Sequence, residues 1–319
     1  MKISINQSPV YYLPFLKGKY TVAPGLKPIE KAEELDKLVF QLDNEFEYFR
    51  KNKEACRAEN IHKYYQKARY NPELEKAVNF YLIKQLSKEH PELFINTEHG
   101  DRAILQCLHT GEMIQYSEEG ELIGESPYID LFDALNCQVQ EDIAVWQLAD
   151  DDDWLAAVHL CAPNHWSAEE KIGQNFDFVH EVIPGMEKIR RHYMGMLDSV
   201  VKKGPYIRFG WGVSTDIKLN HHPDPAPGYS QELWYGRKFD PDFPMLFTRT
   251  ERQCLVGIPE HNAFIFTIRS YFADVSKMDE PTLQALKSAL LSMSAETLVY
   301  KGLDDKREEI IAWLDELMG

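Results

Sequence analysis

The stretch LAAVHLCAPNHWSAEEKIGQNFDFVHEVIPG, residues 155–185, gathers histidine, cysteine, tryptophan and lysine side chains more densely than any other part of the chain. Its opening run, 155–161, is short and mostly apolar and ends at an Ala-Pro-Asn sequence, which predicts a β-strand followed by a turn. Ser167 and Glu170 have the spacing of a capping box, so a short helix should begin there and end near Gly173.

His180 lies near the end of this stretch, after an apolar cluster at 176–179. Pro184 and Gly185 follow it and favour the start of a helix that should continue to about Val201. The pattern therefore predicts a histidine that lies against the core just before a helix begins.

Composition limits the kinds of partner that the chain can have. It has 319 residues, 44% of them hydrophobic, and a formal net charge of −16. Such a charge repels phosphates, so we expect neither a nucleic acid nor an anionic membrane as partner, and we expect cations and basic protein surfaces instead. No apolar run approaches the ~20 residues that span a bilayer, and no signal peptide is evident, which predicts a cytoplasmic protein.

The cysteines argue against several kinds of redox centre. They are five, scattered along the chain and never arranged as CxxC, which disfavours a disulfide framework, a tetrathiolate metal site and an iron–sulfur cluster. The chain also has neither a GxGxxG nor a GxxxxGK[ST] motif. A redox enzyme with this sequence would take its electrons from another protein.

Periodicity predicts an N-terminal helical cap, residues 1–100. Residues 1–28 are rich in proline, glycine and tyrosine and should drape over the body. Helical spacing of apolar residues predicts one amphipathic helix over 30–49 and a second that begins at Pro72 and ends before Pro91.

Short strands are predicted next, over residues 101–275. They are 103–108, 113–116, a hairpin of 139–148 with 155–161 joined by an outward-facing acidic turn at 150–153, and then 206–213, 246–258 and 263–275. Two amphipathic helices around 283–291 and 310–317 should pack on the body as a third unit, 276–319. The predicted class is α+β: a PAS-like antiparallel sheet with helices over a ligand pocket, because two strands, then helices, then three strands is the element order of PAS domains.

Several motifs give the chain a resemblance to the heme-dependent oxidative N-demethylase alpha-subunit-like family. They are VQED at 139–142, the CAPNHW…EKIG…VHEVIPG segment, RFGW at 208–211, RTERQ at 249–253 and FTIRSY at 266–271. The resemblance implies b-type heme in a PAS-like domain and oxidation of a small secondary amine such as dimethylamine by dioxygen. It also implies electron transfer from separate flavin and iron–sulfur reductase proteins.

Heme iron needs an axial ligand, most often a neutral imidazole held by a second hydrogen bond. His180 matches the family's histidine and is our predicted metal ligand, with His192 as the alternative. His159 and His165 are expected to be core or surface histidines, and Cys161 a small buried apolar group.

Lys171, Trp166 and Trp211 are the other candidates for contact with the cofactor, although both tryptophans fit an ordinary core position equally well.

Arg208, Arg252 and Arg269 fall on the three later strands, where a PAS pocket has its far wall. Arginines within apolar strands are rarely buried without partners, so each predicts a carboxylate, a propionate or bound oxygen nearby, or a structural ion pair remote from the pocket. We treat all three as catalytic candidates, together with Glu251. Glu251 and Arg252 are adjacent and should point to opposite faces of their strand.

Two other functions remain compatible with the sequence. One is a heme-binding gas or redox sensor that performs no chemistry, and the other is a heme-free scaffold within an enzyme complex, which would follow if His180 were simply structural.

Overall fold

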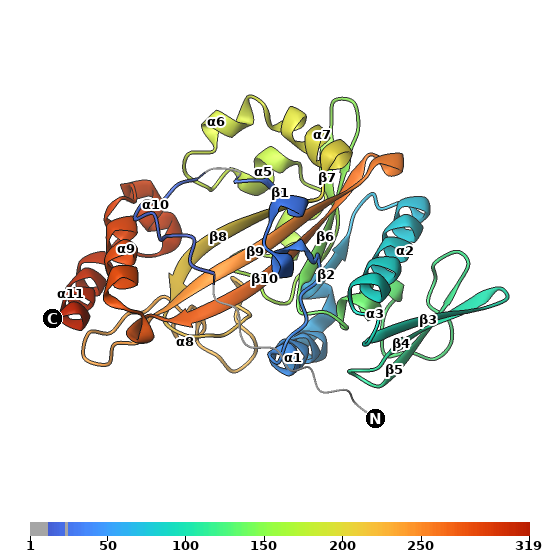
Figure 1. The fold of residues 1–319 in the computed structure, drawn as a ribbon, viewed down its shortest axis with the longest axis horizontal. Helices are drawn as coiled ribbons and strands as arrows, with labels where there is room; N and C mark the ends of the chain where they lie inside the picture. Colours follow the sequence, from blue (N-terminus) through green and yellow to red (C-terminus); the bar gives the residue numbers. More distant parts are fainter. Residues whose placement is uncertain (1–11, 23–24) are drawn as a thin grey trace.

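A computed structural model describes residues 12–22 and 25–319 and confirms the α+β class (Figure 1). Its main sheet is antiparallel, with the order β1-β8-β9-β10-β6-β7-β2. The strands are β1 (Lys27–Pro28), β2 (Tyr65–Lys67), β6 (Asp142–Leu148), β7 (Asp153–His159), β8 (Tyr206–Ser214), β9 (Phe247–Ile258) and β10 (Ala263–Asp274). The first two come from the residues predicted as the N-terminal cap, so this segment contributes both edges of the sheet.

The register of the three long strands sorts their side chains onto two faces. Gly210 lies opposite Glu251, and Arg208 lies opposite Gln253. Because side chains alternate along a strand, these four residues share one face, which we call the pocket face.

The other side of the sheet carries Arg252, which lies opposite both Phe209 and Arg269, with Tyr271 two residues further along β10. We call this side the strap face. The predicted separation of Glu251 from Arg252 is confirmed by this register.

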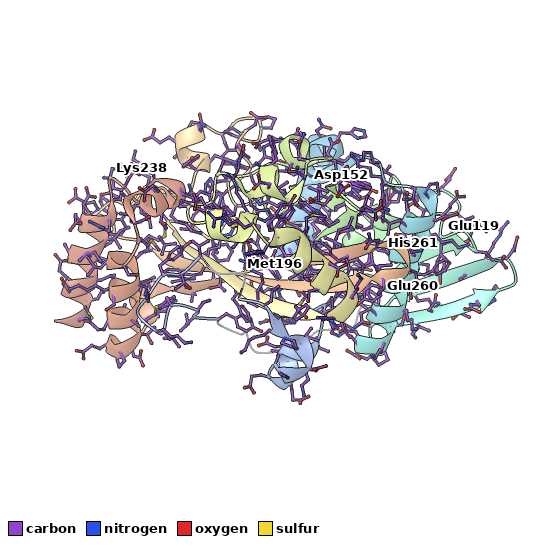
Figure 2. The ribbon with its side chains drawn as sticks, turned by 90° about the horizontal axis from the view of Figure 1, so that it is seen from above. Glu119, Asp152, Met196, Lys238, Glu260 and His261 are labelled. Atoms are coloured by element: carbon purple, nitrogen blue, oxygen red, sulfur yellow. The ribbon has the colours of Figure 1, made fainter. Side chains whose placement is uncertain are left out.

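Four helices that connect β7 to β8 cover the pocket face. They are α4 (Ala168–Lys171), α5 (Phe176–His180), α6 (Glu187–Arg190) and α7 (Tyr193–Lys203). Figure 1 shows α5, α6 and α7 above the sheet. Figure 2 shows Met196 of α7 over the middle of the strands. The single helix predicted over 185–201 is divided, because His192 has a φ of −135° that interrupts the helical backbone between α6 and α7.

The strap face is covered by N-terminal segments. Its apolar core includes residues of α2 (Pro72–Glu89), α3 (Leu131–Asn136) and the three-stranded sheet β3 (Phe94–His99), β4 (Arg102–Cys107) and β5 (Glu112–Ser117). The predicted helix from Pro72 is confirmed, and Asn71 caps it by accepting a hydrogen bond from the amide of Leu74.

The helix predicted over 30–49 is wrong. Residues 29–45, which we call the strap, form only two short 3₁₀ turns, Ile29–Lys31 and Glu34–Lys37, before α1 (Phe46–Tyr64) begins. Buried side chains take the hydrogen bonds that a helix would have made within itself. Arg252 and Arg269 donate to strap carbonyls, while Glu89 and Glu141 accept from strap amides.

The β6–β7 hairpin is confirmed, but its acidic turn does not point wholly outward. Asp153 is buried, and its Oδ2 accepts hydrogen bonds from Trp146 Nε1 at 2.8 Å and from the amide of Phe176 at 2.7 Å. This carboxylate therefore ties the hairpin to the start of α5, the helix that carries His180.

The C-terminal helices α9 (Glu280–Leu291), α10 (Ala295–Lys301) and α11 (Arg307–Met318) gather at one end of the sheet, and the short helix α8 (Gln231–Trp234) precedes β9 (Figure 1). Residues of α9, α10 and α11 form a second apolar cluster with Phe15 and Trp211. Across the described ranges 12–22 and 25–319, every helix is too short or too polar to cross a membrane.

Candidate functional site

His180 is the last residue of α5, and one of its ring nitrogens is already held. Its Nδ1 lies 2.8 Å from the carbonyl oxygen of Phe176, to which it donates, and its ring stacks on that of Phe176 with centroids 4.0 Å apart. Burial, with help from the positive charges of Arg208 and Lys171, lowers the pKa of His180 to about 4. The side chain is therefore a neutral imidazole at neutral pH, and its Nε2 lone pair is left as the acceptor.

A small cavity of about 50 Å³ joins His180 to Arg208 of β8. Its remaining walls are apolar and come from Val22, Phe176, Ile183, Met186, Ile189 and Met196. The cavity thus brings one basic nitrogen and one guanidinium together in apolar, half-buried surroundings.

The side chain of Arg208 is half-buried and makes no hydrogen bond to the residues described. Its Nε is buried and has no hydrogen-bond partner among the described residues. Burial lowers the pKa of Arg208, and the charge that opposes this effect most is the carboxylate of Glu251. A guanidinium in this state is poised to bind a group that the chain itself does not provide.

Glu251 lies beside Arg208 on the pocket face and is held by two amides. It accepts hydrogen bonds from Asn164 Nδ2 at 3.2 Å and from Gln253 Nε2 at 3.0 Å. Opposite it, a side chain at Gly210 would meet nothing closer than Gln253 Nε2 at 3.9 Å, so the strand surface here is bare. Three motifs that are distant in the sequence, CAPNHW, RFGW and RTERQ, meet at this point.

Further cations surround Glu251 that the sequence analysis did not single out as site residues. Lys301, the last residue of α10, donates from Nζ to the carbonyl of Trp211 at 3.0 Å. Burial lowers the pKa of Lys301 to about 8, with Glu251 raising it and Arg237 and Arg249 lowering it further. Lys301 and Arg237 belong to no motif, and nothing in their local sequence distinguishes them from surface cations.

Arg249 is the only one of these cations whose hydrogen bonds are largely made within the fold. It donates to His221 Nδ1 at 2.9 Å and to the carbonyls of Ala162 and Leu219 at 2.8 and 3.1 Å. His221 in turn donates from Nε2 to Asp216 at 2.9 Å. Arg249 therefore anchors the turn after β7 to the pocket face.

The structure does not bring Arg252 and Arg269 to His180, because both lie on the strap face. Arg252 donates to the carbonyls of Asp36 and Val39, and Arg269 forms an ion pair of 2.5 Å with Asp43. Of the three arginines, the structure brings only Arg208 to the His180 cavity.

The remaining predicted residues fall into two groups. Lys171 is buried beside Glu170, with Nζ 5.2 Å from the ring centroid of Phe178, and Trp166 packs in the same apolar cluster as Phe176 and Met196. Both are therefore near the cavity, whereas Trp211 packs on Phe15 in the C-terminal cluster.

Of the other histidines and Cys161, His192 is exposed, while His159 and Cys161 are fully buried. His165 stacks on His221 with ring centroids 5.3 Å apart.

A larger groove of about 650 Å³ lies at the far end of β10. It is lined by Arg269 and Tyr271 and by acidic residues that include Asp43, Glu45 and Asp274. Its described lining contains no histidine or cysteine, and Met278 is the one sulfur-containing side chain among its carboxylates. The smaller cavity at His180 is the better candidate for redox chemistry.

Comparison with known protein families gives a match over most of the chain. Residues 31–311 match the model of the family described as "Haem-dependent oxidative N-demethylase, alpha subunit-like". The match includes both sheet faces, His180, Arg208, Glu251 and Lys301. The chain therefore belongs to the haem-dependent oxidative N-demethylase alpha-subunit-like family.

Proposed function

We propose that this chain binds b-type heme through His180 and oxidises a small secondary amine such as dimethylamine with dioxygen. The observation that carries the proposal is the cavity in which His180, with Nδ1 committed to a carbonyl, meets Arg208, whose Nε has no partner in the described part of the chain. An imidazole held in this way presents Nε2 to a metal, which is the usual arrangement of a heme-ligating histidine.

The types of residue that line the cavity suit heme, but the cavity itself is too small for it. The walls are apolar, the ligand is neutral, and an unsatisfied guanidinium is present for an anionic group. A cavity of about 50 Å³ holds only one or two waters at ~30 Å³ each, so a porphyrin requires an outward movement of the segment between α5 and α7. That segment consists of the short helix α6 and its flanking turns, which have few ties to the sheet.

The bound group would supply the site for dioxygen activation, and the chain's own residues would supply orientation and electrostatics. His180 would hold the metal, and the walls formed by Ile183, Met186 and Met196 would exclude water. Arg208 would donate hydrogen bonds to anionic atoms. Glu251 would accept a hydrogen bond from the ammonium of the substrate, because its carboxylate is held by amides rather than by a cation.

The same proposal includes a PAS-like heme domain over residues 101–275, between an N-terminal unit, 1–100, and C-terminal helices, 276–319. Support comes from the sheet, in which β6 and β7 precede the helical segment and β8, β9 and β10 follow it. Because the sequence has no dinucleotide-binding motif and no clustered cysteines, the electrons would come from a separate flavin and iron–sulfur reductase.

Replacement of His180 by alanine tests the metal ligand. We expect the Soret band of the heme-loaded protein to be lost, or shifted to that of weakly held heme, and external imidazole to restore it in part. His192→Ala is the matched control, because His192 is exposed and one helix away, and its spectrum should equal that of the parent. An unchanged spectrum in the His180 variant would refute the assignment, and oxygen consumption that does not depend on dimethylamine would refute the substrate.

A further inference from the structure

We propose that Arg208, Arg237 and Lys301 form a carboxylate-binding site on the pocket face, which receives the propionate groups of the porphyrin held by His180. This inference rests on the proposed function and assigns a role to two residues, Arg237 and Lys301, that no motif marks.

The three cations come from distant parts of the chain and converge along β8. Arg208, Gly210 and Gly212 are the successive pocket-face positions of this strand. Arg208 stands at the His180 end, and Lys301 Nζ lies 3.7 Å from the position of a Cβ on Gly212 at the other end. The distance along the strand between these two positions is about 13 Å, at roughly 3.3 Å per residue. The side chain of Tyr20 lies close to both cations, with Lys301 Nζ 5.8 Å from its ring centroid.

Arg237 is packed at the end of α10 next to Lys301. Its side chain lies against Gly302, where a Cβ would come within 2.6 Å of Arg237 Cδ. Its Nη1 is 3.4 Å from the carbonyl of Tyr300, which is a long hydrogen bond. Burial lowers the pKa of Arg237, so its charge too is held in a poorly solvated position.

The charges of this cluster do not balance. Glu251 is the carboxylate that raises the pKa values of both Arg208 and Lys301, and it makes its hydrogen bonds with Asn164 and Gln253. Arg249 is a fourth cation nearby, but Asp142 and Asp216 offset its charge. The other three cations face one carboxylate, which leaves two positive charges in surplus. Buried charges without partners are costly, and two carboxylates on one ligand would compensate for this surplus.

Helix capping explains only part of the arrangement. Cations are favourable at a helix C-terminus, and Arg237 and Lys301 stand at the end of α10. However, Lys301 directs its Nζ to the carbonyl of Trp211 on β8, away from its own helix. Capping also leaves unexplained why Arg208, on the sheet, has a buried and unpartnered Nε.

The charges at the two ends of this site favour different ligands. The chain carries a net charge of −16, so its overall field attracts cations. Close to Lys301 the local surplus is positive and disfavours an ammonium group. A cationic amine is therefore expected near Glu251, with carboxylates toward Lys301.

Heme and its dimethyl ester, in which both propionates are uncharged, provide the test. The purified apoprotein is titrated with each, and the dissociation constants are taken from the Soret band. Charge-assisted hydrogen bonds of about 1.5–3 kcal/mol predict that the parent binds the ester roughly 10- to 100-fold more weakly than heme. In the double variant Lys301→Met/Arg237→Met this ratio should fall to within about threefold, while Lys277→Met, at a lysine whose side chain is 80% exposed, should keep the parent's ratio.

Each other outcome overturns a different statement. Equal affinity of the parent for heme and ester, with a normal Soret band, overturns the carboxylate site and leaves His180 as ligand. Absence of binding to either compound overturns the proposed function and this site together. A spectral shift of the heme-loaded parent with acetate, absent in the double variant, overturns the propionate assignment and shows that the cluster binds a free carboxylate.

Discussion

The two faces of the main sheet use buried arginine in opposite ways. On the strap face, Arg252 and Arg269 donate to strap carbonyls and lie beside Asp36 and Asp43. On the pocket face, the Arg208 side chain makes no hydrogen bond to the residues described, whereas Arg269 lacks a partner only at its Nε. The arginines belong to neighbouring strands, so the difference arises from what packs on each face.

This difference separates a structural arginine from one that is available to a ligand. Arg252 and Arg269 replace the internal hydrogen bonds that the strap would make as a helix, and their removal exposes buried carbonyls to an apolar environment. Arg208 makes no side-chain hydrogen bond to the described residues, and we propose that a ligand is its partner. The hydrogen bonds of each arginine therefore decide its role, and burial alone does not.

The largest expected effect on stability comes from replacing one arginine on each face by methionine. Arg269→Met should lower the free energy of unfolding by about 3–5 kcal/mol, because Asp43 is left buried without its partner. Arg208→Met should change it by less than about 1 kcal/mol, or stabilise the protein, because an unpaired buried charge is removed. Chemical denaturation of the two variants without heme measures both values, and equal destabilisation would remove the distinction between the faces.

A smaller difference in stability is expected between alanine substitutions at two glycines on the pocket face. A Cβ at Gly257 would collide with the backbone carbonyl of Val201 in α7, whereas a Cβ at Gly210 has free space. Gly257→Ala should therefore cost about 1–3 kcal/mol of stability through overpacking. Gly210→Ala should cost less than about 0.5 kcal/mol, as for other unstrained sites.

The bare surface at Gly210 can be tested further with a larger side chain. Gly210→Leu should fold but bind heme more weakly than Gly210→Ala, because its side chain would lie over β8. A Soret titration of the two folded variants measures this difference. Equal heme affinity would show that heme does not lie over Gly210.

The smallest expected effect is a pH dependence of stability that arises from His159 on the strap face. His159 is buried there with Nε2 3.0 Å from Asp133. Burial opposes its protonation, but the neighbouring Cys161 and Asp133 raise the pKa of His159 to about 9. A histidine with a raised folded pKa stabilises the protein fully below pH 6.5 and loses this contribution as pH rises through 9.

The contact with Asp133 is the part of this effect that persists, because burial raises the pKa of Cys161 and keeps it a neutral thiol. We therefore expect the free energy of unfolding to fall by only roughly 1–2 kcal/mol between pH 6.5 and 9.5. Urea denaturation across this range measures the loss. His159→Gln should flatten the profile, and a parent profile that is already flat would show that His159 is neutral in the folded protein.

Local patterns in the sequence determined a large part of the fold. Periodicity and capping residues that are close together in the sequence predicted four features of the fold. These are the hairpin of β6 and β7, the long strands β8 to β10, the capping box at Ser167 and the helix from Pro72. The opposite orientation of Glu251 and Arg252 follows equally from the alternation of a strand.

Tertiary structure alone decided which charged groups are satisfied. Arg252 and Arg269 find their partners in the strap, more than two hundred residues away, and those same bonds keep the strap from forming the helix that its spacing predicts. Lys301 reaches the Gly212 end of β8, and Arg237 lies beside it, only because α10 packs there. Spacing along the chain predicts which face of the sheet a residue occupies. Its burial and its hydrogen-bond partners depend on the segments that the fold packs on that face. For this reason the site at Arg208 could be identified only from the structure.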